Sequence, residues 1–443
     1  MATRETALSE SGDTPSTASS GGPLRRVISL RDFRLLFIGT ATSLLGDQFA
    51  LIATPWLVLQ LTGDPLALGI VLALEGIPRA AFMLIGGAIT DRFAPRRVML
   101  ISDIVRFVLA TVMAAVVLTG TVQIWMVYGF AFGFGLVAGF AIPAENSMVP
   151  MLVNDADLQA GNSLIMGVSQ LAGFVGPSVA GAAIAGFSES AFGIGLAFLI
   201  DAATFAVSTT CLWLIRDSAQ TVDDRPAGSL WASIGEGIEY LWRDEALRLM
   251  FLVLIVVNFF VVGPLLVGIP VLSHERLPQG AMAFGLLMGA FSVGNLVGYL
   301  LAGSFNRPSG RAIRAIILGV LMAFGAVICS LGLIAQMWLD IGLLLLLGTG
   351  NGYLAIILFS WIQSRVSRGM LGRVMSLVTF SSLGLVSASQ AISGAVGRWN
   401  LDILFLTAGG LVLAMTAWTA AHPSLGVLSE NIAGPIAVGD TNQ

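Results

Sequence analysis

Twelve apolar runs, each about twenty residues long, constrain the fold of this chain more than any other feature. An α-helix of that length crosses the hydrocarbon core of a bilayer, where only helices and closed barrels satisfy their backbone polar groups. We therefore predict an all-α membrane protein with twelve transmembrane helices. The predicted spans are Leu35–Leu61, Leu66–Thr90, Val98–Leu118, Ile124–Ile142, Leu164–Ala185, Ala191–Ile215, Leu249–Leu272, Met282–Ala302, Ile313–Ile334, Ile341–Ile362, Val374–Val396 and Leu401–Ala421.

The composition agrees with lipid as the main solvent. Of the 443 residues, 56% are hydrophobic and 11% are charged, whereas a soluble domain is about 25% charged. The net charge of −4 gives no electrostatic footprint for nucleic acid. Cys211 and Cys329, the two cysteines, lie inside apolar runs, so neither a disulfide framework nor a metal site is expected, and no cofactor is predicted.

The arginines set the predicted orientation, because the chain contains no lysine. With twelve spans both termini lie on one side of the membrane, and 18 arginines fall on that side. Arg276 and Arg398 fall on the opposite side, while Arg79 and Arg106 lie inside spans. Since basic residues gather on the cytoplasmic side, we expect both termini in the cytoplasm and the chain in the cell (inner or plasma) membrane.

A polar stretch between the sixth and seventh spans divides the chain into two halves. Leu230, Ile234, Ile238 and Leu241 recur there at helical spacing, which predicts an amphipathic helix on the cytoplasmic surface; the alternative is a plain linker. The expected organisation is a disordered cytoplasmic tail (1–30), a six-helix bundle (31–216), a cytoplasmic linker with this helix (217–247), a second six-helix bundle (248–422) and a cytoplasmic tail (423–443).

The second span ends in the sequence "GGAITDRFAPRR", which carries a known loop pattern. Gly87, Asp91, Arg92 and Arg96 resemble the G-x-x-x-D-R-x-G-R-K loop between helices two and three of the major facilitator superfamily. The resemblance implies two pseudo-symmetric six-helix bundles and a charge latch at Asp91 that takes part in switching. Ala94 stands where the pattern has its second glycine, so the turn departs from the family.

Other stretches narrow the resemblance to one branch. "GDQFALIATPWLVLQLTGDPLALG" and "AENSMVPMLVNDADLQAGNSL" are similar to the branch that contains macrolide-efflux proteins and the enterobactin exporter. In "AGFVGPSVAG", the residues Ala172, Gly176, Pro177 and Gly181 resemble the antiporter signature of the fifth span. The alternative for these four is an ordinary packing face of small residues.

Six charged residues of the first half fall inside predicted spans, where each costs on the order of 2.5–3.5 kcal/mol unless it is paired or hydrated. They are Asp47, Glu75, Arg79, Asp103, Arg106 and Asp201. Helical spacing allows Glu75 to pair with Arg79 and Asp103 with Arg106, which leaves two acids without a local cation. Because burial favours the neutral form of a carboxyl group, one acid is expected to bind a proton. The alternative is a structural hydrogen-bond network.

Apart from Asp402 at the start of the last span, no acid lies inside a predicted span of the second half, which offers uncharged candidates instead. We interpret five residues as lining of a binding cavity, although packing is the alternative for each: Trp56, Asn258, Asn295, Trp361 and Gln390.

The resemblance implies a transporter that exports amphipathic small molecules against proton entry, acting as a monomer in the lipid bilayer. An importer, or a siderophore, lipid or metabolite transporter of the same fold, is the first alternative. A membrane sensor or scaffold without transport is the second. A membrane enzyme would need clustered catalytic residues at one membrane face, and the chain carries no ATP-binding G-x-x-x-x-G-K loop.

Overall fold

The computed structural model describes residues 22–90, 94–216, 230–304 and 310–421. Over these ranges the chain forms helices joined by short turns, with no strand. Twelve helical segments in this part of the chain are long and apolar enough to cross a membrane. The predicted all-α membrane fold with twelve spans is confirmed.

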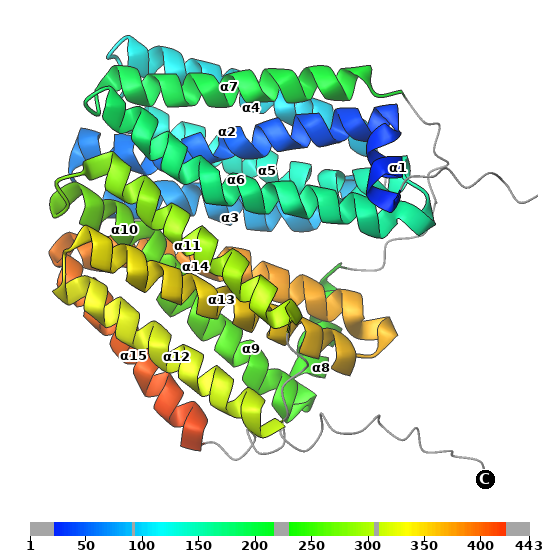
Figure 1. Ribbon diagram of the computed structural model, residues 1–443, viewed down its shortest axis with the longest axis vertical. Helices are drawn as coiled ribbons and strands as arrows, with labels where there is room; N and C mark the ends of the chain where they lie inside the picture. The colour runs from blue at the N-terminus through cyan, green and yellow to red at the C-terminus, as the bar shows by residue number, and fades with distance from the viewer. Residues whose placement is uncertain (1–21, 91–93, 217–229, 305–309, 422–443) are drawn as a thin grey trace, which may run out of the picture.

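The first half forms one bundle, drawn in blue to green in Figure 1. In it α2 packs against α6 and α7, α3 against α5, and α4 against α5 and α7. Its elements are α1 (Pro23–Ser29), α2 (Arg31–Thr62), α3 (Pro65–Thr90), α4 (Pro95–Leu118), α5 (Ile124–Leu152), the 3₁₀ turn η1 (Asp155–Asp157), α6 (Leu158–Gly186) and α7 (Ala191–Leu214).

The second half forms the other bundle, drawn in green to red in Figure 1. Its first span is built from two α-helices joined by a π turn, η2. In this half α11 packs against α13, α12 against α15, and α10 against α14. The elements are α9 (Glu245–Val257), η2 (Asn258–Val262), α10 (Gly263–Glu275), α11 (Gly280–Ser304), α12 (Gly310–Leu333), α13 (Met337–Arg365), α14 (Arg368–Trp399) and α15 (Leu401–Ala421).

Helix α1 lies in a segment that the sequence analysis expected to be disordered. Val27 on this helix is fully buried in an apolar cluster that also contains Phe33 and Leu36. Arg26 forms an ion pair of 2.8 Å with Asp157. Order in the described chain therefore begins before residue 30, because one apolar side chain and one ion pair attach this short helix to the bundle.

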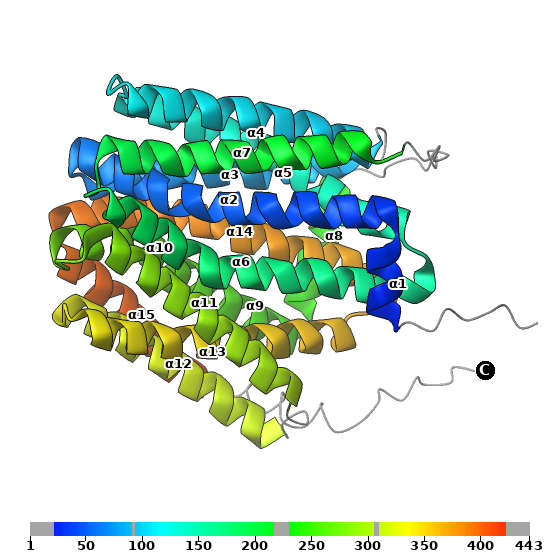
Figure 2. The same ribbon diagram turned by 45° about the horizontal axis from the view of Figure 1, so that its top comes forward.

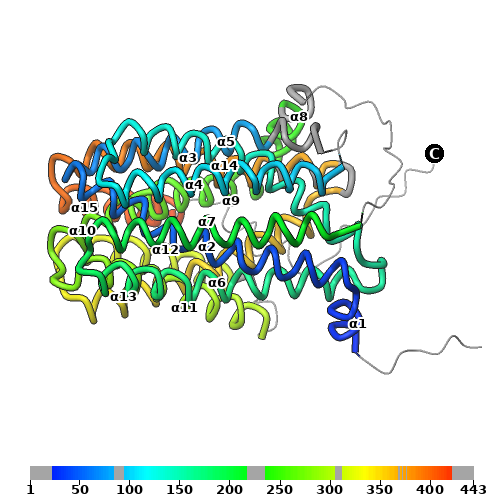
Figure 3. Tube along the Cα trace, turned by 90° about the horizontal axis from the view of Figure 1, so that it is seen from above, coloured from blue at the N-terminus to red at the C-terminus, as the bar shows by residue number. Residues whose placement is uncertain are grey.

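The amphipathic helix of the linker forms as α8 (Leu230–Arg243). It lies at the same end of the molecule as α1 (Figure 3), and it packs against α9 and α14. Leu241 is buried there, while Arg373 of α14 forms an ion pair with Glu236. The helix is thus attached to the second bundle through one face, whereas Ile238 and Trp242 are exposed.

We call the end of the molecule with α1 and α8 the tail end, and the opposite end the far end. The two halves meet where α3 crosses α14 and where α6 crosses α11; Figure 2 shows α6, α11 and α14 between the outer helices of the two bundles. At the crossings a Cβ built on Gly69 would lie 2.9 Å from Cα of Gly394, and one built on Gly181 would lie 2.9 Å from Cα of Gly285. Only glycine permits such close approach of the backbones.

Candidate functional site

Charged side chains from four helices gather inside the first bundle. We call this group the acid cluster: Asp47 of α2, Asp103 and Arg106 of α4, Glu145 of α5 and Asp201 of α7. Sequence spacing alone does not bring these residues together, because they lie on different helices. Tertiary packing of α2, α4, α5 and α7 creates the cluster.

Arg106 is the shared cation of the acid cluster. It interacts electrostatically with Asp47, Asp103, Glu145 and Asp201. Its guanidinium carbon lies 5.3 Å from the ring centroid of Phe134 and 5.5 Å from that of Phe205. Aromatic faces attract a cation at this distance. Two aromatic rings therefore contact the guanidinium of Arg106, and four carboxyl groups interact with its charge.

Asp103 is bonded differently from the prediction. Its Oδ2 accepts a hydrogen bond of 2.6 Å from the hydroxyl of Ser208 on α7, and its side chain is buried. Within the described residues no ion pair joins Asp103 directly to Arg106. The expected pairing at a spacing of three residues is thus replaced by a hydrogen bond between helices.

Asp201 is the most completely buried acid of the cluster, with 0% of its surface exposed. Both of its carboxyl oxygens, and Oδ1 of Asp47, lack a hydrogen-bond partner in the described part of the chain. Oδ1 of Asp201 lies 2.8 Å from the position that a Cβ would occupy on Gly46, the residue before Asp47. The carboxyl group therefore faces α2 beside Asp47, at a glycine that leaves room for it.

The predicted pair between Glu75 and Arg79 is present on α3, with Nη1 of Arg79 3.4 Å from Oε1 of Glu75. Both side chains are about one-third exposed, at 30% and 32%. Both residues also interact electrostatically with Asp47, which links the pair to the acid cluster.

Sequence reasoning missed Glu145. The fourth span was predicted to end at Ile142, but α5 continues through Pro143 and Pro150 to Leu152. Counting Glu145, the cluster and the α3 pair contain five carboxyl groups and two guanidinium groups. The available signal was that proline is tolerated inside membrane helices, so Pro143 did not have to end the span.

A second missed acid is Asp340. It stands one residue before the predicted span Ile341–Ile362, and so was expected to lie outside the membrane-spanning helices. In the structure Asp340 lies in the first turn of α13 with 0% exposure, and neither carboxyl oxygen has a partner among the residues described. The prediction that Asp340 lies outside the spans of the second half is therefore wrong.

The loop motif is only partly visible. Gly87 lies on α3, while Asp91 and Arg92 lie outside the described residues. Arg96, in the first turn of α4, donates hydrogen bonds of 2.8 Å to the carbonyl oxygen of Leu212 and 2.9 Å to that of Trp213. These carbonyls end α7, so the arginine stabilises the negative end of that helix.

The antiporter-like residues lie on one buried face of α6, between α2 and the second half. Ala172, Gly176, Pro177 and Gly181 are all buried. Gly176 packs against the side chain of Gln48, next to Asp47. Gly181 forms the crossing with α11. The motif therefore contacts both the helix of Asp47 and the opposite bundle.

The five candidate cavity residues do not converge on one space. Asn258 donates to Ser382 of α14 at 3.4 Å, and Asn295 accepts from Asn351 of α13 at 2.8 Å. Gln390 is buried on α14, and its backbone carbonyl oxygen lies close to Gly69 of α3. Asn258, Asn295 and Gln390 thus contact other helices rather than one common site.

The two tryptophans of that set lie at opposite ends of the molecule. Trp56 is buried near the far end, where its ring centroid is 5.3 Å from that of His274. It helps to line a pocket of about 450 Å³ together with Glu189 and Gln279. Trp361 lies at the tail end, where the guanidinium carbon of Arg365 is 5.4 Å from its ring centroid.

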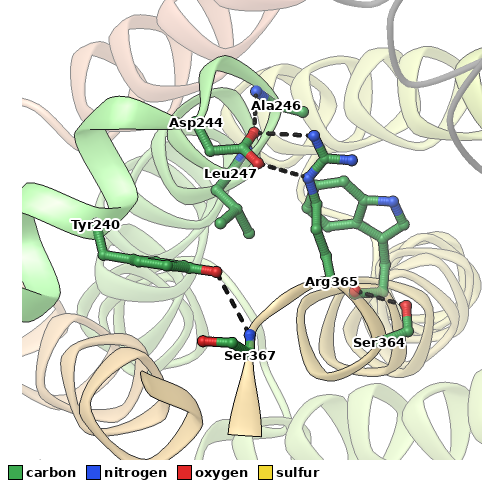
Figure 4. Close-up of polar contacts among 8 residues, drawn as sticks. Tyr240, Asp244, Ala246, Leu247, Ser364, Arg365 and Ser367 are labelled. Carbon is green, nitrogen blue, oxygen red and sulfur yellow. Dashed lines mark hydrogen bonds and ion pairs between the residues drawn. The ribbon is translucent and has the colours of Figure 1, made fainter. Parts of the chain in front are cut away.

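The tail end of the second half is fixed by Asp244, which caps α9 (Figure 4). Its Oδ1 accepts from the amides of Ala246 and Leu247 at 2.9 and 3.1 Å. Arg365 of α13 donates to Oδ2 at 2.7 Å and to Oδ1 at 3.2 Å. Burial raises the pKa of Asp244, but the bonds from Arg365, Leu247 and Ala246 outweigh it and bring the pKa below its ordinary value of 3.8.

Solved structures with the same arrangement of helices are transporters. A nucleoside transporter, NupG, superimposes with a TM-score of 0.68 at 14% identity, covering 90% of this chain and 99% of that one. A bacterial homologue of the human lysosomal transporter Spinster, in an inward-facing conformation, gives a TM-score of 0.64 at 12% identity, covering 93% and 97%. At this identity the likeness establishes the fold.

Sequence relatives carry the names of efflux pumps. The multidrug efflux pump Tap of Mycolicibacterium fortuitum is 26% identical over 373 residues, which are 82% of this chain and 89% of that protein. Macrolide efflux protein A of Streptococcus pyogenes is 22% identical over 392 residues, 86% of this chain and 94% of that protein. The model of the Major Facilitator Superfamily matches residues 36–391. The chain is a multi-pass membrane transporter, not an enzyme, and it belongs to the Major Facilitator Superfamily.

Proposed function

We propose that this protein exports amphipathic small molecules across the cell membrane, driven by proton entry, through alternating access of one site between its two halves. Two relatives named for multidrug and macrolide efflux support the substrate class. The protein acts as a monomer in the lipid bilayer. A siderophore, lipid or metabolite as substrate is the alternative within the same fold.

The uneven contact between the halves is the observation that supports alternating access most directly. At the α3–α14 crossing Gly76 packs against Ser387, and at the α6–α11 crossing Gly289 packs against Ser178. Together with the glycine pairs described above, these contacts fall between mid-helix and the far end. Two rigid bundles that touch at one end are suited to rocking between two arrangements.

The orientation follows from the arginine distribution. The tail end is the side of the 18 arginines, which we assign to the cytoplasm by the positive-inside rule. The far end then faces outward, and the described state is closed toward the outside. In this orientation Asp91 and Arg92 would form the latch of the motif at the cytoplasmic ends of α3 and α4.

The acid cluster supports proton coupling. Its four carboxyl groups share Arg106, and a buried charge without a partner is costly. Binding a proton removes such a charge without moving a helix. Asp47 is the acid that we assign to coupling, because it interacts with both Arg106 and the Glu75–Arg79 pair and lies beside Gln48, which packs on the motif of α6.

The test is uptake into inverted membrane vesicles of one neutral and one cationic amphipathic compound, with the proton gradient present or collapsed. We expect wild-type uptake to need the gradient. Asp47→Asn keeps size and hydrogen bonding but cannot carry a cycling charge, so it should still exchange substrate passively while driven accumulation falls to background. Asp32→Asn, a change at the tail end of the same helix, is the matched control and should retain driven uptake.

Three other outcomes are informative. Unaltered driven uptake of both compounds by Asp47→Asn would contradict coupling at this residue, and Glu75 would be tested next. If Asp47→Asn loses uptake of the cationic compound but retains driven uptake of the neutral one, Asp47 would be assigned to substrate recognition. No flux of any compound by the inserted wild-type protein would favour a sensor or scaffold.

A further inference from the structure

One polar contact at the far end joins the two halves directly. Glu189 lies in the turn between α6 and α7, in the first half, and its Oε1 accepts a hydrogen bond of 2.7 Å from the backbone amide of Ala281. Ala281 is in the first turn of α11, in the second half. A carboxylate therefore sits on the free amide groups at the positive end of a 25-residue helix.

The turn that carries Glu189 is held firmly by the first half. The backbone oxygen of Glu189 accepts a hydrogen bond of 2.6 Å from Nε2 of Gln60 on α2. Ser188 and Glu189 have φ values of 54° and 55°, the left-handed region that residues other than glycine rarely adopt. An unfavourable backbone conformation that persists is held by its surroundings, and here it directs the side chain across the interface.

The receiving side of the contact needs a glycine. Gly280 has a φ of 51°, and a Cβ at this position would overlap the carboxyl group of Glu189. Gly280 thus meets two requirements at once, a left-handed conformation and close approach of the acid. The two sides of the contact are matched in shape as well as in charge.

We propose that Glu189 is the gating residue of the far end: its carboxylate, seated on the start of α11, holds the two halves closed there and must leave each time they open. This inference rests on the proposed alternating access. Glu189 also lines the 450 Å³ pocket, so water replaces the lost hydrogen bond when the halves separate. The contact is therefore strong enough to bias the closed state without locking it.

A second contact across the far end is weaker. Asp64, in the turn between α2 and α3, lies 3.7 Å from Arg398 at the end of α14. Arg398 is 58% exposed, and ion pairs between exposed side chains stabilise little. Glu189 is expected to dominate, because its partner is a fixed backbone amide rather than a mobile, solvated side chain.

Labelling of a cysteine inside the interface tests the proposal. Ser387 of α14 is 1% exposed and packs against Gly76 of α3, so Ser387→Cys reports separation of the halves. The native thiols are removed by Cys211→Ser and Cys329→Ser. In intact cells, a membrane-impermeant maleimide should label position 387 about tenfold faster in Glu189→Ala, as expected when a hydrogen bond to a charged group is lost. Glu189→Gln should give an intermediate rate.

Two further variants sharpen the result. Gly280→Ala should raise labelling like Glu189→Ala, because its Cβ displaces the carboxylate. Glu275→Gln changes an exposed acid at the same end that makes no hydrogen bond or ion pair with any described residue, and it should leave the rate unchanged. Thermal unfolding of each purified variant confirms that folding is intact.

Wild-type labelling rates in both Glu189→Ala and Gly280→Ala would overturn the gating role. Gly69→Leu distinguishes a wrong gating residue from an absence of alternating access. A large side chain at the α3–α14 crossing must force the halves apart, whatever the role of Glu189. Faster labelling in Gly69→Leu alone would retain alternating access and reject Glu189. Equal labelling rates in all variants would reject both alternating access and the gating role of Glu189.

Discussion

At the scale of the residue, the first bundle depends on one cation that serves several acids. Arg106 interacts with four carboxyl groups on four helices, and two aromatic rings hold its guanidinium. Sequence spacing suggested pairs within a helix instead. That reasoning was right for Glu75 and Arg79, whose geometry is set by a single helix, and it failed for Asp103, because Ser208 of α7 competes for the carboxylate.

We expect Arg106→Gln to lower the free energy of unfolding by about 3 kcal/mol, since removal of one partner leaves buried charge without compensation. Arg106→Lys should recover part of the loss. Adding Asp47→Asn to Arg106→Gln should also restore stability, because one of the uncompensated charges is then removed. Thermal unfolding in detergent of the wild type, Arg106→Gln, Asp47→Asn and the double variant measures the coupling. Additive effects of the two substitutions would show that the residues do not interact.

The missed acids have a common cause. Glu145 and Asp340 lie just outside the apolar runs used to define the spans, yet both are inside helices. Hydropathy locates the middle of a span well, because many residues contribute to it. It locates the ends poorly, because a buried acid and a solvated acid look the same in a sequence.

At the scale of the element, α8 shows what periodicity can and cannot predict. The spacing of its apolar residues predicted an amphipathic helix, and the described helix runs over Leu230–Arg243. The spacing did not predict its partner. The side chains of α9 and α14, with the ion pair between Glu236 and Arg373, supply that information, and they lie far away in the sequence.

The start of α9 gives a pH prediction. Because the pKa of Asp244 in the folded protein is below its ordinary value of 3.8, its stabilising contribution is complete above about pH 4 and disappears as the pH falls through the folded pKa. Asp244→Asn keeps a good helix cap but loses the charged pair with Arg365, so at pH 7 it should cost about 1–2 kcal/mol. The difference from the wild type should be constant between about pH 5 and about pH 8, because Asp244 is ionised in both the folded and the unfolded state over this range.

The measurement is thermal unfolding in detergent at pH 7 and at roughly pH 3, which is below the ordinary pKa of Asp244, so the difference between wild type and variant should narrow there. Glu239→Gln is the matched control, because the pair of Glu239 with Arg243 on α8 is largely exposed and should contribute little. A difference between wild type and Asp244→Asn that persists unchanged in acid would show that the ion pair is not its cause.

At the scale of the whole molecule, the number of spans and the division into halves could be predicted because each rests on about twenty residues at a time. The conformational state of the molecule could not be predicted from the sequence. Closure at the far end depends on a few glycines at which two backbones touch, such as Gly181 and Gly285, and glycine is common throughout the chain. The choice of which glycines meet is made by the packing of whole bundles.

Topology is tested with reporters. A reporter fused after Gln443 should be active in the cytoplasm, whereas one inserted at Gly63, in the turn between α2 and α3, should be active outside. The physical reason is the concentration of 18 arginines on the side of the termini. Reporters that respond on the same side would contradict the assignment, since eleven spans, an odd number, separate the two positions.

The π turn η2 gives the seventh span a property that a continuous α-helix lacks. An extra residue in one turn shifts the following side chains by about 100° around the axis and interrupts the regular ladder of backbone bonds. Pro264, just after it, lacks an amide donor and widens the interruption. We therefore expect α10, whose His274 lies beside Trp56, to turn relative to α9 more easily than it could in a continuous helix, while Asp244 remains bound to Arg365 at the tail end.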